Sequence, residues 1–237
     1  DKQFEFVYRN VKEKGGIGYL NGGAGRGKTF TVSAFIRVFK KIDNDVTFLL
    51  LAPTGRAAKQ LEESTGIPAS TLHHFIFTAN KQGKDNNVDV YIIDETSMVD
   101  MKLFYRFIRL TSPSAKVIVV GHDRQLESID AGRIFADIIY SHTFDGVTLD
   151  VAKRFKSDSK IFENAERILS HQDLIPHNDE KENEIIYTQS DEEMLEVILK
   201  KLRERYNDDI GFKNTQVLVP LYRGVVGIDY LNYRIKK

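Results

Sequence analysis

The sequence has no cysteine, and its charges cancel: 34 Lys and Arg residues stand against 34 Asp and Glu residues in 237 positions. Without cysteine there is neither a disulfide framework nor a thiolate metal site, which fits a reducing compartment, so we expect a cytoplasmic protein. Because the net charge is +0, an attraction for nucleic acid must come from local patches rather than from a global field.

Long hydrophobic runs are also absent. The longest, such as Phe48 to Ala52 and Val117 to Val120, fall far short of the roughly 20 residues that span a bilayer, so we expect no membrane partner. The sequence begins at Asp1 with no initiator methionine and no basic-then-apolar signal, and we expect a trimmed piece of a longer chain. With 41% hydrophobic and 29% charged residues, the composition excludes collagen-like, low-complexity and disordered classes.

Short apolar, β-branched runs alternate with helical patterns, which is typical of β-α units around a mostly parallel sheet. The expected strands are Ile17 to Asn21, Val46 to Ala52, Val88 to Asp94, Lys116 to Gly121, Val147 to Leu149 and Gln216 to Pro220. The expected helices are Lys28 to Lys40, Arg56 to Glu63, Lys102 to Leu110, Ile134 to Tyr140, Ser159 to Leu169 and Glu192 to Tyr206. We expect a domain boundary near Asp150, with one domain over 1–150 and a second over 151–237.

One stretch, 22–29, reads G-G-A-G-R-G-K-T and matches the phosphate-loop pattern G-x-x-x-x-G-K-[ST] between a predicted strand and a predicted helix. Its backbone N–H groups and the helix N-terminus favour phosphate oxygens. We expect Lys28 to reach the β- and γ-phosphates of ATP and the Thr29 hydroxyl to ligate Mg²⁺. Arg26 adds a cation near the phosphates or swings outward, and the sequence leaves both orientations open. The residues expected to bind the nucleotide are Gly23, Ala24, Gly25, Arg26, Gly27, Lys28, Thr29 and Phe30.

The predicted strand Val88 to Asp94 ends in two carboxylates, Asp94 and Glu95. We expect Asp94 to hold the water shell of Mg²⁺ and Glu95 to orient or deprotonate the attacking water. Gln125, in the polar loop after the strand that ends at Gly121, is expected to hydrogen-bond both the γ-phosphate and that water. An accidental acidic turn and an ordinary surface glutamine are the alternatives.

The order of the remaining blocks resembles the superfamily 1 (1B) DNA helicases of the RecD-like group, which includes RecD, the relaxase-helicases and the phage Dda helicase. The blocks that carry this resemblance are L-A-P-T-G-R-A-A-K at 51–59, S-T-L-H at 70–73, D-E-T-S-M-V-D at 94–100, G-H-D-R-Q-L-E-S at 121–128, the stretch 149–154 followed by S-K-I-F-E-N-A at 159–165, and V-P-L-Y-R-G-V-V-G at 219–227. Together they cover nearly the whole chain.

The resemblance implies an α/β P-loop NTPase fold: a RecA-like parallel sheet flanked by helices, with part of a second RecA-like lobe. It implies an ATP-hydrolysing motor on single-stranded DNA, 5′ to 3′ in direction, with nuclease or recombination and repair subunits as partners. Gln3 falls where the family reads adenine, and Arg154 where it contacts the nucleotide from the second lobe. The implied DNA-binding residues are Pro53, Thr54, Arg56, Thr71 and His73.

Three positions depart from the family pattern: His122 replaces its usual Asp, Glu127 its Pro, and Arg26 its Thr or Ser. Later motifs of the second lobe are not found before Lys237, so we expect a first lobe and part of a second. Two rival functions stay open. One is a P-loop ATPase that acts as a switch on protein partners, and the other is a DNA-binding subunit with an impaired ATPase.

Overall fold

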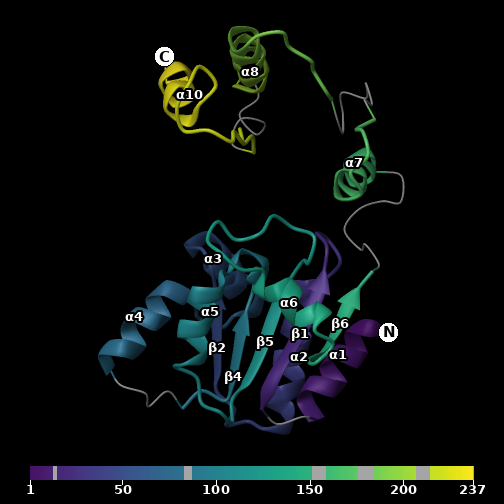
Figure 1. The fold of residues 1–237 in the computed structure, drawn as a ribbon, viewed down its shortest axis with the longest axis vertical. Helices are drawn as coiled ribbons and strands as arrows, with labels where there is room; N and C mark the ends of the chain where they lie inside the picture. The colour runs from purple at the N-terminus through teal and green to yellow at the C-terminus, as the bar shows by residue number, and fades with distance from the viewer. Residues whose placement is uncertain (13–14, 83–86, 151–158, 176–183, 207–213, 237) are drawn as a thin grey trace. The chain divides into compact units, whose positions relative to one another are not determined.

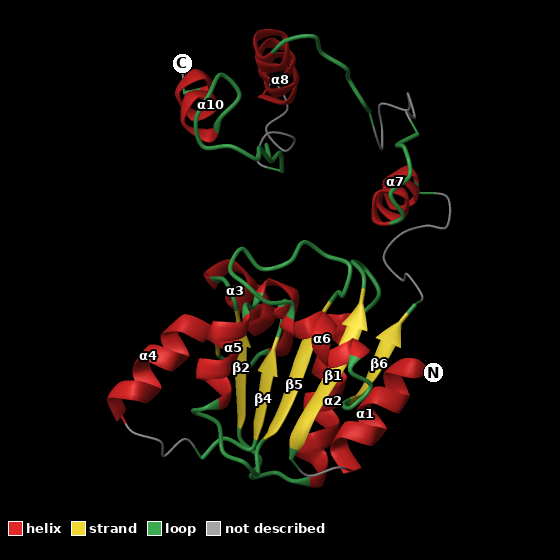
Figure 2. Ribbon diagram, viewed as in Figure 1, coloured by secondary structure: helices red, strands yellow, loops and turns green. Residues whose placement is uncertain are grey.

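The computed structural model describes residues 1–12, 15–82, 87–150, 159–175, 184–206 and 214–236. The chain divides into two compact units, residues 1–172 and 173–237. The first is built on a six-stranded sheet in the order β3-β2-β4-β5-β1-β6, in which every paired strand is parallel to its neighbour (Figures 1 and 2).

The strands of this sheet are β1 (Gly16–Gly22), β2 (Phe48–Ala52), β3 (Ala69–Thr71), β4 (Val90–Ile93), β5 (Lys116–Gly121) and β6 (Asp145–Leu149). The helices of the first unit are α1 (Lys2–Lys12), α2 (Lys28–Ile42), α3 (Gly55–Thr65), α4 (Leu72–Gln82), the short 3₁₀ helix η1 (Thr96–Met98), α5 (Met101–Ile108), α6 (Ile134–Tyr140) and α7 (Lys160–Leu169).

Two hydrophobic cores lie on the two faces of the sheet, because successive side chains of a strand point to opposite faces. Ile92 of β4 packs in the core that α1, α2 and α3 cover, whereas its neighbours Tyr91 and Ile93 pack in the core under α4, α5 and α6. All four residues of β4 and all six of β5 are buried, as is typical of central strands in a parallel sheet. Both central strands are therefore held on two sides, and the loops at their carboxyl ends stand on a rigid base.

The strand register brings distant loops together at the carboxyl edge of the sheet. Ala52 of β2 pairs with Thr71 of β3, so the segments after 52 and at 71 are neighbours. On the other side of β2, Leu51 pairs with Ile93 of β4, the residue before Asp94. The blocks at 51–59, 70–73 and 94–100 thus begin at the carboxyl ends of the neighbouring strands β2, β3 and β4.

The second unit contains α8 (Asp191–Tyr206) and α10 (Ile228–Ile235). Leu195 and Leu199 of α8 pack with Leu231 of α10, and Val219 and Val225 lie against this small core. The described part of this unit has no strand.

Most of the predicted elements are confirmed, with ends within two residues of those observed. The strand expected over Gln216 to Pro220 is wrong: no strand of the described residues pairs with this segment, and a strand without backbone partners does not persist in water. Helices α1, α4 and α10 and the short strand β3 were not predicted. Helix α7 belongs to the first compact unit, which ends at residue 172. The functional boundary near Asp150 stays a prediction.

Candidate nucleotide and DNA site

The phosphate loop connects β1 to α2. Gly25 and Gly27 adopt left-handed backbone conformations, with φ of 71° and 86°, which residues other than glycine rarely accept. Lys28 folds back over the loop, and its Nζ donates to the carbonyl oxygens of Gly22 at 2.6 Å and Gly23 at 3.3 Å. The ammonium group therefore lies within the loop, where the pattern predicts that it meets phosphate.

A cavity of about 570 Å³ opens over this loop. It is lined by Gln3, Gly23, Ala24, Gly25, Arg26, Gly27, Lys28, Thr29, Phe30, Ala57, Gln60, Leu61, Ser64, Asp94 and Glu95. Gln3 and the whole expected set from Gly23 to Phe30 thus lie on its wall, whereas Gln125, expected at the γ-phosphate, does not. The wall residues from α3 were missed by the sequence analysis, although their spacing places 57, 60 and 64 on one helical face.

Gln3 ties α1 to the phosphate loop. Its Nε2 donates to Thr31 Oγ1 at 3.0 Å and to the Gly27 carbonyl oxygen at 3.4 Å. Gln3 thus reaches the nucleotide cavity from a helix that the sequence did not predict, and its reading of adenine stays a prediction.

Asp94 and Glu95 enter the cavity from the end of β4. Asp94 Oδ1 accepts the backbone N–H of Glu95 at 2.9 Å. Burial raises the pKa of Asp94 to about 6, against the lowering effects of that hydrogen bond and of the Lys28 charge, while the Glu95 carboxylate raises it further. A carboxylate held at this cost favours a cation beside it.

Glu95 is strained. Its φ of 51° is unusual for a residue other than glycine, and such outliers gather at functional sites. Its Oε2 is buried with no hydrogen-bond partner among the described residues. Together with the Asp94 carboxylate and the Thr29 hydroxyl on the same cavity wall, this buried acceptor fits Mg²⁺ and its water shell, because Mg²⁺ takes one or two protein oxygens and keeps several waters.

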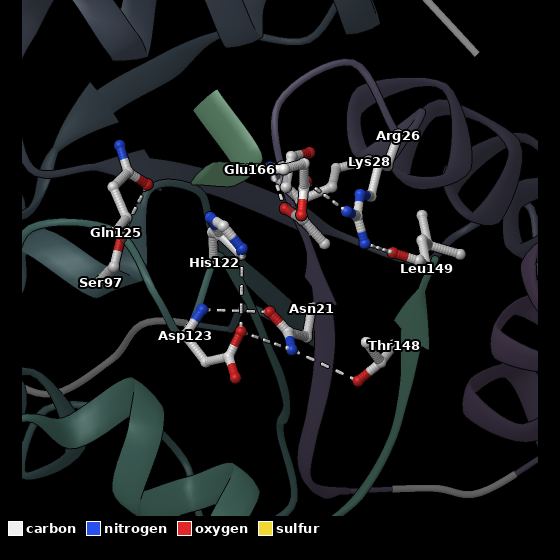
Figure 3. Close-up of polar contacts among 12 residues, drawn as sticks. Asn21, Arg26, Lys28, Ser97, His122, Asp123, Gln125, Thr148, Leu149 and Glu166 are labelled. Carbon is white, nitrogen blue, oxygen red and sulfur yellow. Dashed lines mark hydrogen bonds and ion pairs between the residues drawn. The ribbon is translucent and has the colours of Figure 1, made fainter. Parts of the chain in front are cut away.

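Gln125 lies beside the segment that follows the two carboxylates. Its Oε1 accepts the Ser97 hydroxyl at 3.2 Å, which links the loop after β5 to η1 (Figure 3). His122, in the same loop, approaches the phosphate loop: a Cβ built on Gly23 falls 3.6 Å from its ring. Burial lowers the pKa of His122, the Asp123 carboxylate raises it, and the charges of Lys28 and Arg26 lower it further. The imidazole is therefore neutral near pH 7.

A partly buried polar network holds this loop. Asn21, at the end of β1, donates to Asp123 Oδ1 at 3.0 Å and to Thr148 Oγ1 at 3.3 Å, and accepts the Asp123 backbone N–H at 3.1 Å (Figure 3). The Tyr140 hydroxyl donates to Asp123 Oδ2 at 2.8 Å. Burial would raise the pKa of Asp123, but the bonds from Tyr140 and Asn21 outweigh it and lower the pKa. The network keeps a carboxylate charged one residue from His122.

Arg26 turns away from the loop axis. Its guanidinium donates to Glu166 Oε1 of α7 at 2.9 Å and to the Leu149 carbonyl oxygen at 3.3 Å (Figure 3). The outward orientation is thus the one observed, although the side chain still forms part of the cavity wall. It joins the phosphate loop to the helix that carries the S-K-I-F-E-N-A block.

The residues expected to contact DNA lie at the ends of β2 and β3. Thr54 caps α3 by accepting the Ala57 N–H at 3.2 Å, and Thr71 accepts the His74 N–H at 3.2 Å near the start of α4. A hydroxyl that accepts a backbone N–H keeps its own proton as a donor for phosphate. Arg56 and His73 are exposed beside them, and Pro53 is half-buried.

The family of AAA domains designated AAA_30 matches residues 1–184, which span this whole arrangement. The chain belongs to this family of AAA domains. It is 30% identical over 222 residues to the ATP-dependent RecD2 DNA helicase of Deinococcus radiodurans, which covers 92% of this chain and 30% of that protein. It is 31% identical over 158 residues to the RecBCD enzyme subunit RecD of Haemophilus influenzae, which covers 52% of this chain and 25% of that protein.

This AAA domain thus spans about a quarter to a third of the length of these relatives. Among solved structures, it matches the Pif1 helicase from Candida albicans with a TM-score of 0.55 at 22% identity, over 71% of this chain and 43% of that one. That likeness confirms the RecA-like α/β fold.

Two of the departures noted in the sequence are close together in this AAA domain. Arg26 Nε and the His122 ring both lie within 3.6 Å of a Cβ built on Gly23. Glu127, the third departure, pairs with Arg133 Nε at 3.2 Å on an exposed loop. Arg154 lies outside the described residues. No helix in the described ranges is long and apolar enough to cross a membrane.

Proposed function

We propose that this chain carries the first RecA-like lobe (1–150) and part of the second (151–237) of an ATP-dependent DNA helicase that translocates on single-stranded DNA, 5′ to 3′. The proposal rests above all on one observation: the nucleotide residues end β1, β4 and β5, and the candidate DNA contacts end the adjacent strands β2 and β3 of the same sheet. The relatives named as DNA helicases support it.

The residues of the site divide the chemistry among them. Lys28 neutralises phosphate charge within the loop, and Gln3 reads the base. Glu95, whose buried Oε2 has no hydrogen-bond partner in the described part of the chain, orients or deprotonates the attacking water. Mg²⁺, held by Thr29 and Asp94, supplies charge neutralisation at the phosphates when bound. Arg154 completes the catalytic set from the second lobe.

Coupling between the two sites follows from shared elements. Helix α3 begins at the Thr54 cap, among the DNA candidates, and lines the nucleotide cavity with Ala57 and Gln60. Through Ser97, Gln125 adds a second link between the loops that follow β4 and β5. A phosphate contact at Thr54 and a nucleotide in the cavity therefore act on one rigid helix.

The whole protein is proposed to be cytoplasmic and to work with nuclease or recombination and repair subunits, as the relative named as a RecBCD subunit suggests by its name. The protein-directed switch remains the second candidate, and an ATPase-impaired DNA-binding subunit the third. The observation that favours the last is the block at 121–128, in which His122 replaces the family's usual Asp and lies beside the phosphate loop.

The test is the affinity of this chain for a fluorescent oligo-dT strand, with and without a non-hydrolysable ATP analogue and Mg²⁺, at two salt concentrations. We expect salt-sensitive binding that changes several-fold with the nucleotide, because the sites are coupled. Lys28→Ala should abolish the nucleotide effect, and the exposed control Lys59→Ala should keep it. An oligo-dT affinity that does not change with the nucleotide would favour the DNA-binding subunit with an impaired ATPase. No binding to oligo-dT would favour the protein-directed switch.

A further inference from the structure

Helix α4 exposes an aromatic ring on an otherwise polar face. Leu72, Phe75 and Ile76 of this helix are buried in the core, yet Phe77 is 59% exposed. The ammonium of Lys81 lies 4.3 Å from the centre of the Phe77 ring. Single exposed apolar side chains are common on protein surfaces, so the exposure of Phe77 carries weight only together with its neighbours on the helix.

The exposed ring lies in line with the DNA candidates. His73, Phe77 and Lys81 are spaced by four residues, so they follow one another along a single helical face over about 12 Å. The line begins next to Thr71, which the strand register places beside the segment that carries Thr54.

The two described helices α4 and α5 carry basic but no acidic residues. Helix α5 packs against α4 through Phe75 and Phe107, with ring centres 5.9 Å apart. Helix α5 repeats the pattern: the Arg109 guanidinium after its end lies 6.0 Å from the centre of the Tyr105 ring, which is 60% exposed. Exposed aromatic rings beside cations fit a ligand with flat π faces and negative charges, which is the chemistry of single-stranded nucleic acid.

A comparison within the chain supports this interpretation. On α1, Tyr8 is 56% exposed with Lys12 5.8 Å from its ring, the same pair at the same spacing. There, however, Glu5 pairs with Arg9 at 2.6 Å on the same helix, and the Tyr8 ring stacks on Phe4. On α1 the Tyr8 ring is thus already stacked on another ring, and the neighbouring Arg9 is already paired with a carboxylate, so this pair serves as a matched control.

We propose that the exposed face of α4 extends the path of single-stranded DNA beyond Thr71 and His73, with Phe77 stacking on a base and Lys81 pairing with a phosphate. This inference rests on the proposed function and adds a stacking contact to it. Stacking recognises bases of every kind, so the contact gives grip without sequence preference.

The experiment measures the affinity of the whole chain, by fluorescence anisotropy, for an oligo-dT strand and for a strand of equal length made only of abasic sites. We expect Phe77→Ala to weaken binding to oligo-dT by about 10-fold and to leave binding to the abasic strand unchanged. Lys81→Ala should weaken binding to both strands and reduce the slope of log affinity against log salt by about 1. Tyr8→Ala should change neither affinity.

Three results would overturn the inference: equal losses on the two strands for Phe77→Ala, an equal loss for Tyr8→Ala, or no loss for Phe77→Ala while Thr71→Ala weakens binding. In the last case Phe77 makes no DNA contact, and the proposed function stands without it. If the unaltered chain binds neither strand, the proposed function fails together with this inference. Melting temperatures of the variants, expected to match that of the unaltered chain because both rings are exposed, show that each one is folded.

Discussion

The buried carboxyl of Asp94 makes the nucleotide site costly for stability, and Asp94→Asn measures that cost. Burial lifts the pKa of Asp94 from its ordinary value of 3.8 to about 6. The folded state therefore holds its proton more tightly than the unfolded state does. Stability from this group is fully present below pH 3.8 and is lost as the pH rises through about 6.

The magnitude follows from the pKa difference. About two pKa units at 1.36 kcal/mol each give a penalty of about 3 kcal/mol at pH 7.5. Asparagine carries no charge and keeps an oxygen that accepts the Glu95 N–H. We expect Asp94→Asn to raise the free energy of unfolding by about 3 kcal/mol at pH 7.5 and by only about 1 kcal/mol at pH 4.5. For a chain of this size the gain at pH 7.5 is roughly 6–12 °C in melting temperature.

The assay is urea unfolding and thermal melting of both proteins in EDTA, at pH 7.5 and 4.5. The matched control is Asp89→Asn, for which we expect a change of opposite sign in the free energy of unfolding. Backbone and side-chain hydrogen bonds from Thr47, at 2.8 and 2.7 Å, lower the pKa of Asp89. Its replacement should therefore destabilise the chain at pH 7.5, and the effect should fade as the pH falls. The reasoning is refuted if Asp94→Asn is no more stable at pH 7.5, or if its advantage is the same at both pH values.

Three further predictions concern the loops and the sheet. A double-mutant cycle of Arg26→Thr and Glu166→Gln should give a coupling energy below about 1 kcal/mol in urea unfolding, because the Glu166 side chain is 38% exposed and water screens the pair; a coupling near 3 kcal/mol would show a buried pair instead. Gln125→Ala should leave nucleotide affinity within about twofold and remove DNA-stimulated ATP turnover in a version with the whole second lobe. Stimulation that survives would contradict the coupling role. Gly146→Ala should lower stability by about 1–3 kcal/mol in thermal melting, because a Cβ there overlaps the Tyr19 ring, and an unchanged melting temperature would mean that the ring shifts freely.

The elements that the sequence predicted correctly are those whose pattern is local. Strand β5 is an unbroken apolar run and α6 a short amphipathic one, and both were found at the expected residues. The strand expected over Gln216 to Pro220 shows the limit of this reasoning, since an apolar run becomes a strand only when a partner strand lies beside it. Helix α1 escaped prediction because its register is set by packing of Phe6 and Val7 against α2 rather than by capping residues.

The sequence by itself predicted the residues of the site, which are the phosphate loop with Lys28 and the Asp94 and Glu95 pair at a strand end, and it indicated their family. These depend on residue types at fixed spacing along the chain, which local backbone geometry turns into a loop and a strand end. Only the tertiary structure decided what surrounds them. The α3 wall of the cavity and the bond between Arg26 and Glu166 join residues that strand register and helix packing bring together, and no local pattern encodes those distances.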